Sequence, residues 1–282
     1  MVEHRRFGNL LPHIVLLIGV AIVAFPVYLA VIGSTHNDVV ISNGQMPLYP
    51  GSHGIETYWK TIVSGTGKTT REPVGSMLIS SLIMAVGIAV GKIAISIISA
   101  YAVVFFSFPF RMTTFWIIFV TLMLPVEVRI FPTYKIASDL HLLDSYSGLI
   151  LPLIASATAT LLFRQFFMTI PKELIEASKM DGAGPIRFFF DTLLPLSMTN
   201  IAALFVILFI YGWNQYLWPL LITTRDDMQT IVIGIKKIID VKDALTEWSV
   251  AMATAVLAML PPVAVVVLMQ RLFVKGLIET EK

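Results

Sequence analysis

Residues 169–197 read TIPKELIEASKMDGAGPIRFFFDTLLPLS and interrupt a chain that is otherwise dominated by apolar residues. Thr169 is of a type that caps helices, so we expect a first helix to begin within two residues of it. The sequence DGAGP ends that helix, because Gly182 allows a positive φ and proline cannot continue a helix. Pro185 is then expected to open a second helix that ends near Pro195. The stretch therefore predicts a polar helix–turn–helix between long apolar runs.

The composition excludes an ordinary soluble domain. Of the 282 residues, 56% are hydrophobic and only 13% are charged, whereas soluble domains carry about 25% charged residues. The net charge of +2 and the lack of a Lys/Arg run argue against a nucleic-acid partner. The absence of cysteine excludes disulfides and thiolate chemistry. The chain therefore requires membrane lipid as its surroundings.

Six apolar runs are each long enough to cross a bilayer, which takes about 20 helical residues. The predicted fold is an all-α polytopic membrane protein with six transmembrane helices, at 11–33, 77–106, 113–134, 146–167, 199–223 and 249–274. The first run is too long for a signal-peptide core and is interpreted as an uncleaved span. Bends are expected at Pro26, Pro125, Pro132 and Pro261, where a backbone donor is missing.

Positive charges predict the orientation. Arg5 and Arg6 precede the first span, which favours a cytoplasmic N-terminus and, after six spans, a cytoplasmic C-terminus. The predicted organisation is a cytoplasmic N-terminus (1–10), a first span (11–33), a periplasmic loop (34–76), a core domain of five spans (77–274) that includes the loop 169–197, and a cytoplasmic tail (275–282). The helix–turn–helix then faces the cytoplasm, where ATP is present.

This helix–turn–helix resembles the cytoplasmic loop of ATP-binding-cassette importer membrane subunits. That loop reads Glu-Ala-Ala, three residues, Gly, nine residues, Ile, one residue, Leu-Pro. Two positions depart from it: Ser178 stands for the second Ala, and Thr192 stands for Ile. The resemblance implies that the loop sits in a groove of an ATPase subunit, with Glu176 paired to a cation there. The implied coupling residues are Glu176, Ala177, Ser178, Asp181, Gly182, Leu194 and Pro195. The alternative is an ordinary interfacial amphipathic hairpin.

Longer strings resemble the membrane subunits of sn-glycerol-3-phosphate importers, and in particular the second of their two permease subunits. These strings are LPVEVRIFP at 124–132 and YGWNQYLWP at 211–219; the tail QRLFVKGL at 270–277 is similar to the wider sugar-importer branch. The resemblance implies an inner-membrane protein that translocates sn-glycerol-3-phosphate, or a related glycerophosphodiester, by alternating access. It also implies a second, unlike permease subunit, two ATPase subunits that use ATP and Mg, and a periplasmic substrate-binding protein.

The chain is not expected to be an enzyme by itself or to bind a cofactor, since it has no phosphate loop of its own. Its five His residues show no metal-ligand spacing, so no metal site is predicted. Two other functions remain open: an importer permease for a neutral sugar or polyol, and an ion-coupled secondary transporter. The latter requires carboxylates near the middle of the membrane, and Glu127 is the only acid in a predicted span.

Four polar residues predict a substrate path. Glu127 lies 14 residues past Thr113, about 21 Å along an ideal helix. By the same count of residues along an ideal helix, Arg129, Asn214 and Gln215 lie at a similar depth. We expect Arg129 to receive an anionic substrate, with Asn214 or Gln215 as hydrogen-bond partners. The alternative is structural: Glu127 and Arg129 anchor the end of the span and bond across a subunit interface.

Other features have plainer interpretations. Lys92 is expected near the cytoplasmic end of the second span, from where its ammonium can reach water. The aromatic residues Trp213, Tyr216 and Trp218 favour a membrane-interface belt over stacking on a ligand. Gly87-x-x-x-Gly91 predicts close approach of a neighbouring helix. The charged outer loop 224–248 is either a docking surface for the binding protein or a solvated loop.

Overall fold

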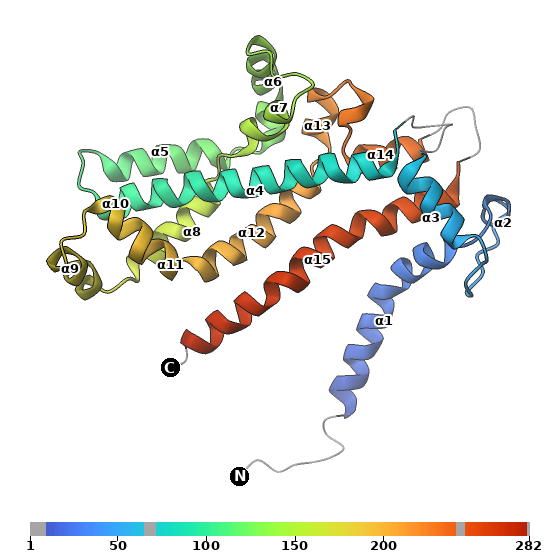
Figure 1. The fold of residues 1–282 in the computed structure, drawn as a ribbon, viewed down its shortest axis with the longest axis horizontal. Coiled ribbons are helices and arrows are strands. Elements are labelled where there is room, and N and C mark those ends of the chain that lie inside the picture. The colour runs from blue at the N-terminus through green and yellow to red at the C-terminus, as the bar shows by residue number, and fades with distance from the viewer. Residues whose placement is uncertain (1–9, 65–71, 241–245, 281–282) are drawn as a thin grey trace. The chain divides into compact units, whose positions relative to one another are not determined.

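The computed structural model describes residues 10–64, 72–240 and 246–280, and every regular element in these ranges is helical. The α-helices are α1 (Leu10–Gly33), α2 (Asp38–Ser42), α3 (Gly54–Val63), α4 (Val74–Phe105), α5 (Arg111–Met123), α6 (Ile130–Asp139), α7 (Tyr146–Ile150), α8 (Ala157–Met168), α9 (Lys172–Met180), α10 (Pro185–Phe188), α11 (Leu194–Leu196), α12 (Met198–Trp213), α13 (Leu217–Ile222), α14 (Ile231–Ile239) and α15 (Trp248–Thr280) (Figure 1). Short 3-10 or π turns join some of them: η1 (Val126–Arg129), η2 (Leu151–Leu153), η3 (Phe189–Leu193) and η4 (Asp226–Met228). Most of the predicted N-terminal segment 1–10, and the last two residues of the predicted tail 275–282, lie outside the described residues.

Three helical segments in the described part of the chain are long and apolar enough to cross a membrane: Pro12–Gly33, Val74–Phe105 and Trp248–Gln270. Two bent helix pairs raise this number to five, and they are Tyr146–Leu153 with Ala157–Met168, at 52°, and Pro185–Leu196 with Met198–Trp213, at 70°. A shorter apolar helix covers Arg111–Thr121. The prediction of an all-helical polytopic membrane protein is confirmed, with three to five candidate spans against the six predicted.

The chain forms two compact units, one of Met1–Met77 with Gly234–Leu260 and one of Leu78–Ile233 with Pro261–Lys282. In the first unit, polar contacts join the segment after α1 to the start of α15. The backbone N–H of Ser249 donates to Asp38 Oδ1 at 2.7 Å. Lys60 Nζ lies 3.8 Å from Glu247 Oε1. Residues distant in sequence are therefore fixed together around the beginning of α15.

In the second unit, α4 lies against the bend between α7 and α8. A methyl group added at Gly87 would come within 2.6 Å of Ile150 Cδ1, and one at Gly91 within 2.5 Å of Ile154 Cγ2. Both glycines therefore permit the close approach that their spacing predicts.

The core of the second unit lies where α6, α7 and α13 gather (Figure 1). Trp218 is 1% exposed, and its indole N–H donates to the Gly148 carbonyl oxygen at 3.1 Å. Trp213 is 2% exposed and stacks on Phe209. The prediction that these two tryptophans belong to an interface belt is wrong, because their rings fill the interior of this unit. The core fixes the segments that carry the polar residues described below.

Candidate functional site

The stretch 169–197 forms two short helices around a turn. The first helix, α9, ends at Met180 with Asp181 as its C-cap, and Gly182 adopts a φ of +74° in the turn. Pro185 then opens α10. Thr169 does not cap α9, contrary to the sequence prediction: its hydroxyl donates to the Phe166 carbonyl oxygen at the end of α8. Pro171 occupies the cap position of α9 instead.

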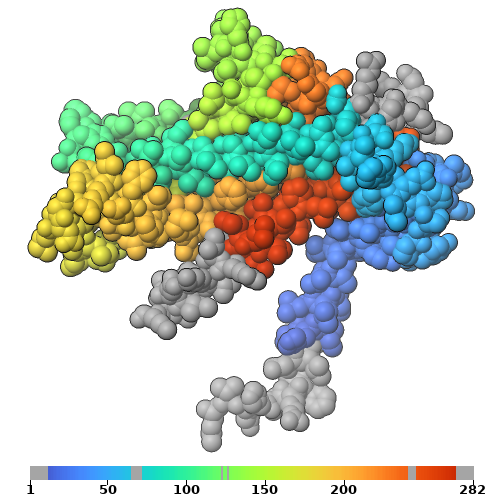
Figure 2. Space-filling view, in the orientation of Figure 1, coloured from blue at the N-terminus to red at the C-terminus, as the bar shows by residue number. Residues whose placement is uncertain are grey.

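The residues that match the importer loop lie mostly on the surface. Glu176, Ala177 and Asp181 are exposed, and no residue of α9 is buried. The segment α9–α11, yellow in Figure 2, forms a projection at one end of the second unit. Because most side chains of this polar helix are exposed, they remain available to another protein.

The second half of this stretch contains a local widening of the helix. The π turn η3 comes directly before α11, where Pro195 lacks the backbone donor that a regular helix needs. Leu194 is partly buried, Leu193 is fully buried, and the chain then turns by 70° into α12. The two matching residues Leu194 and Pro195 therefore lie where the surface projection joins a candidate span.

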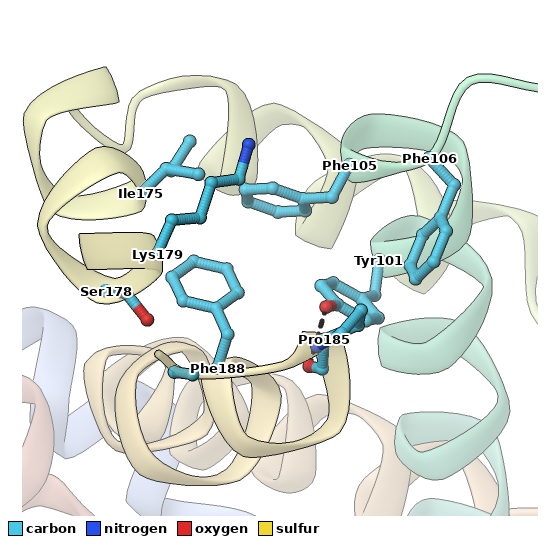
Figure 3. Close-up of a pocket in the computed structure, with 9 residues that line it drawn as sticks. Tyr101, Phe105, Phe106, Ile175, Ser178, Lys179, Pro185 and Phe188 are labelled. Atoms are coloured by element: carbon cyan, nitrogen blue, oxygen red, sulfur yellow. Dashed lines mark hydrogen bonds between the residues drawn. The ribbon is translucent and has the colours of Figure 1, made fainter. Parts of the chain in front are cut away.

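Aromatic side chains connect the projection to α4. The Tyr101 hydroxyl donates to the Pro185 carbonyl oxygen at 2.8 Å, and the ring of Tyr101 lies 5.1 Å from that of Phe189. Phe105 and Phe188 are 5.5 Å apart between ring centroids. Figure 3 shows Tyr101, Phe105 and Phe188 around a cavity of about 240 Å³, to which α9 contributes Ile175, Ser178 and Lys179. Ser178, partly buried, thus faces this cavity.

The sequence prediction did not include this aromatic contact. A signal for it was present, since the end of the second apolar run and the middle of the loop are both rich in Phe, at Phe105–Phe106 and Phe188–Phe190. That pattern indicates a contact only once the two segments are known to meet.

The second group of predicted residues lies at two breaks in candidate spans. The helix α5 ends at Met123, and Leu124 and Pro125 are extended before η1, so the break expected at Pro125 is present. Glu127 and Arg129 lie on η1 and not on a continuous α-helix. The distance of about 21 Å expected along one ideal helix from Thr113 to Glu127 therefore does not hold, because the helix breaks before η1.

A second break follows α12. Asn214 is the last cap residue of α12, and Gln215 lies in the short link to α13. This break was not predicted, because no proline lies in the link itself. The side-chain N–H of Gln215 donates to the Tyr211 carbonyl oxygen at 3.2 Å.

Tyr211 is the point on which three of the four predicted residues converge. The charges of Glu127 and Arg129 both act on its phenol, and the side-chain N–H of Gln215 donates to its backbone carbonyl oxygen. Arg129 and Gln215 are partly buried, and Glu127 is exposed. Asn214 is also exposed, and among the described residues its side chain has no hydrogen-bond partner. The structure therefore groups Glu127, Arg129 and Gln215, and leaves Asn214 outside.

Lys92 belongs to the same group, although the sequence prediction placed it near the cytoplasmic end of its span. It lies 18 residues after Val74 and 13 before Phe105, in the middle part of α4, and is 7% exposed. Its ammonium lies 3.9 Å from the centroid of the Tyr211 ring, and the charge of Arg129 acts on it. The sequence did contain a sign of this buried position, because Lys92 is a lone lysine well inside a long apolar run.

No metal-binding arrangement is found among the described residues, where no three His, Asp or Glu side chains are grouped to hold an ion. The two sites thus consist of a polar surface projection and a group of charged and amide side chains at helix breaks. The side chains of both sites can recognise a partner or ligand through charge and hydrogen bonds.

Several bacterial transport proteins are similar in sequence to this chain along its whole length. The protein named "sn-glycerol-3-phosphate transport system permease protein UgpE" of Rhizobium meliloti (strain 1021) is 58% identical over 282 residues, covering 100% of both chains. Proteins of the same name from Agrobacterium fabrum and Yersinia pestis bv. Antiqua are 57% and 54% identical, again over 100% of both chains.

A solved structure shares the fold. It is described as the crystal structure of a bacterial ABC transporter involved in the import of the acidic polysaccharide alginate. The TM-score is 0.80 at 19% sequence identity, and the match covers 96% of this chain and 99% of the other. The described helices therefore follow the arrangement of an ABC transporter chain.

Residues 78–279 match the family described as "Binding-protein-dependent transport system inner membrane component". This match and the full-length relatives confirm the resemblance to importer permeases and the multi-pass inner-membrane location. They also confirm a non-catalytic role, because the family is a membrane component of transport systems. The chain belongs to the family of binding-protein-dependent transport system inner membrane components.

Proposed function

We propose that this chain is one of two unlike transmembrane subunits of an ATP-driven importer that translocates sn-glycerol-3-phosphate, or a related glycerophosphodiester, by alternating access. The observation that carries the proposal is the identity of 54–58% along the entire chain to proteins named for sn-glycerol-3-phosphate transport. The group around Tyr211 supports it, since an anionic substrate requires cations along its path.

In this proposal six spans cross the membrane, with both termini in the cytoplasm. The spans correspond to α1, α4, α5 continued by α6, α7 with α8, α12 with α13, and α15. Segment 34–76 is then periplasmic, 77–274 is the core domain, 169–197 faces the cytoplasm and 275–282 is a cytoplasmic tail. Breaks inside spans are tolerated at membrane depth where protein or water satisfies the freed backbone groups.

The projection α9–α11 is the proposed coupling loop. Glu176 pairs with a cation in a groove of the ATPase subunit, and Gly182 permits the turn that shapes the loop. Exposure of Glu176 and the hydrogen bond from Tyr101 to Pro185 support this role, since one side of the projection is free and the other is joined to α4. Closure of two ATPase subunits, which bind ATP and Mg, is then transmitted to the spans.

The proposed substrate path includes Arg129, with Gln215 and Asn214 as hydrogen-bond partners and Glu127 at its edge. A guanidinium forms two parallel bonds to a phosphate, which suits it to a phosphate ester. Exposed Glu127 and Asn214 lie where a second permease subunit can complete the path. A periplasmic binding protein delivers the substrate, and the outer loop 224–248 is its proposed docking surface.

The test is uptake by vesicles that contain both permease subunits, the ATPase and the binding protein. We expect ATP-dependent accumulation of sn-glycerol-3-phosphate that excess glycerol does not inhibit. Arg129→Gln should lower this uptake at least about tenfold, whereas Lys135→Gln, an exposed position on α6, should leave it unchanged. Normal uptake by an assembled Arg129→Gln complex removes the substrate role of Arg129.

Two other outcomes would replace the proposal. ATP-coupled uptake of a neutral sugar or polyol, without uptake of the phosphate ester, retains the importer and rejects the substrate. Uptake driven by an ion gradient in the absence of ATP indicates a secondary transporter.

A further inference from the structure

A lysine in the middle of α4 is the least expected charge in this fold. Lys92 lies about 27 Å along the helix from Val74 and about 20 Å from Phe105, at 1.5 Å per residue. Neither end is close enough for its side chain to reach, and the residue is only 7% exposed. Ionisable residues inside membrane-spanning segments are rare and face protein or a water-filled path.

The neighbours of Lys92 do not neutralise it. Its ammonium lies on the face of the Tyr211 ring, at 3.9 Å from the centroid. An aromatic face attracts a cation but accepts no conventional hydrogen bond. The charge that acts on it belongs to another cation, Arg129. Among the described residues, neither Lys92 nor Arg129 forms an ion pair with a carboxylate, in contrast to Lys60, Arg187, Arg225 and Lys236.

These contacts leave hydrogen-bonding capacity unused. An ammonium carries three N–H donors and a guanidinium carries five. In the described part of the chain, no side chain or backbone oxygen accepts a bond from Lys92, and none accepts one from Arg129. Glu127, the one carboxylate whose charge also acts on Tyr211, is exposed and forms no ion pair with either cation in the described part of the chain. An incoming dianion would therefore stabilise this pair of cations, of which Lys92 is buried against Tyr211 and Arg129 is half-buried.

We propose that Lys92 and Arg129 together form one site for the doubly charged phosphate of the transported ester, with Tyr211 as the residue that positions the Lys92 ammonium. This inference rests on the proposed function, in which the substrate is a phosphate ester. A phosphate monoester carries a charge of about −1.5 to −2 at pH 7, which two cations match. A glycerophosphodiester carries a single phosphate charge and depends less on the second cation.

The first test compares Lys92→Met with Lys92→Arg in the four-component vesicles. Methionine retains the length of the side chain and removes its charge. We expect the KM for sn-glycerol-3-phosphate uptake to rise about 10- to 100-fold in Lys92→Met, and to rise only a few-fold for a glycerophosphodiester. Lys92→Arg should stay within about threefold of the unchanged chain. Lys135→Met is the matched control, because Lys135 is exposed on α6.

A second test covers the case in which Lys92→Met does not assemble, and it uses the absence of cysteine from the chain. In Lys92→Cys, the thiolate attacks a methanethiosulfonate, which forms a mixed disulfide and releases methanesulfinate. The 2-aminoethyl reagent restores an ammonium at nearly the original length, and the ethyl reagent restores only bulk. We expect uptake to recover with the 2-aminoethyl reagent alone. Complexes with the unmodified chain, treated in parallel, report any reaction of partner subunits.

The outcomes separate this inference from the proposed function. Uptake of sn-glycerol-3-phosphate by the unmodified complex, with an unchanged KM in Lys92→Met, rejects the site and leaves the proposed function standing. Equal recovery of uptake with both reagents would show that the side chain at position 92 serves packing, and would reject the site. A thiol at position 92 that reacts with neither reagent would reject the site as well, because a substrate site must be accessible. A complex that takes up no phosphate ester at all rejects the proposed function, and the inference with it.

Discussion

The hydroxyl of Tyr101, near the end of α4, donates a hydrogen bond of 2.8 Å to the carbonyl oxygen of Pro185, the first residue of α10. This bond joins a candidate span directly to the surface projection α9–α11. A displacement of the projection therefore pulls on α4, the helix that also carries Lys92. In the proposed importer, this contact is one route by which ATPase closure reaches the substrate path.

Tyr101→Phe removes this hydrogen bond and retains the ring contacts with Phe105, Phe188 and Phe189. We expect a loss of about 1 kcal/mol at the contact and a severalfold fall in substrate molecules transported per ATP hydrolysed, in a complex that still assembles. Tyr49→Phe, at an exposed tyrosine of the first unit, is the control. An unchanged ratio in Tyr101→Phe would show that the bond carries no coupling.

Gly182 and Gly184 provide a matched pair within the projection. A methyl group meets nothing within 4 Å at either position, but Gly182 has a φ of +74° and Gly184 a φ of −70°. Gly182→Ala should therefore strain the turn by about 1–2 kcal/mol, and Gly184→Ala should not. We expect the ATPase to co-purify severalfold less with Gly182→Ala only. Equal co-purification of the ATPase with both variants would show that docking does not depend on the shape of this turn.

The buried hydrogen bond of Trp218 predicts a stability effect. Trp218→Phe leaves the Gly148 carbonyl oxygen without its indole donor inside the core, at a cost of about 1–3 kcal/mol. The melting temperature of the purified complex should fall by a few degrees. Trp116→Phe, at a ring 53% exposed on α5, should shift it far less. A melting temperature equally insensitive to both substitutions would contradict the structural role of Trp218.

Asp144 predicts a pH dependence outside the candidate spans. The Thr224 hydroxyl and the backbone N–H groups of Arg225 and Thr224 donate to its carboxylate, and these bonds lower the pKa of Asp144 below its ordinary value. The stabilisation is thus fully present above the pKa of the unfolded carboxyl, and is lost as the pH falls through the lower pKa of the folded state.

Hydrogen exchange at Thr224 and Arg225 measures this effect. Protection of their amides should be constant down to about pH 4 and decline below it, whereas Asp144→Asn should show weaker protection without this decline. Because the carboxylate is close to the surface, we expect a small change. Identical profiles in the two proteins would exclude Asp144 as the titrating group.

The elements predicted from the sequence are those that local chemistry decides. The C-terminal end of α9 follows from the turn sequence at Gly182, and the break before η1 follows from Pro125, because each depends on the chain's own backbone. The close approach at Gly87 follows from the lack of a side chain there. Thr169 is an exception, since its hydroxyl bonds back to the preceding helix and does not cap the next one.

The features that the sequence could not predict depend on which helices meet. The buried positions of Trp213 and Trp218 require the core around α13, whereas their sequence is equally compatible with a membrane interface. The contact of Lys92 with Tyr211 joins residues of two helices that are far apart in sequence. The break at Gln215 has no proline to indicate it, so an uninterrupted apolar run was the natural prediction.

The most direct test of the proposed coupling role is ATP-dependent uptake of sn-glycerol-3-phosphate by four-component vesicles that contain Glu176→Lys. Glu173→Lys is the matched control, since both residues are exposed on α9 and one turn apart. We predict that Glu176→Lys abolishes uptake and co-purification of the ATPase, whereas Glu173→Lys retains most of both. Normal ATP-dependent uptake in Glu176→Lys, or uptake that needs no ATP in the unchanged complex, would contradict the account.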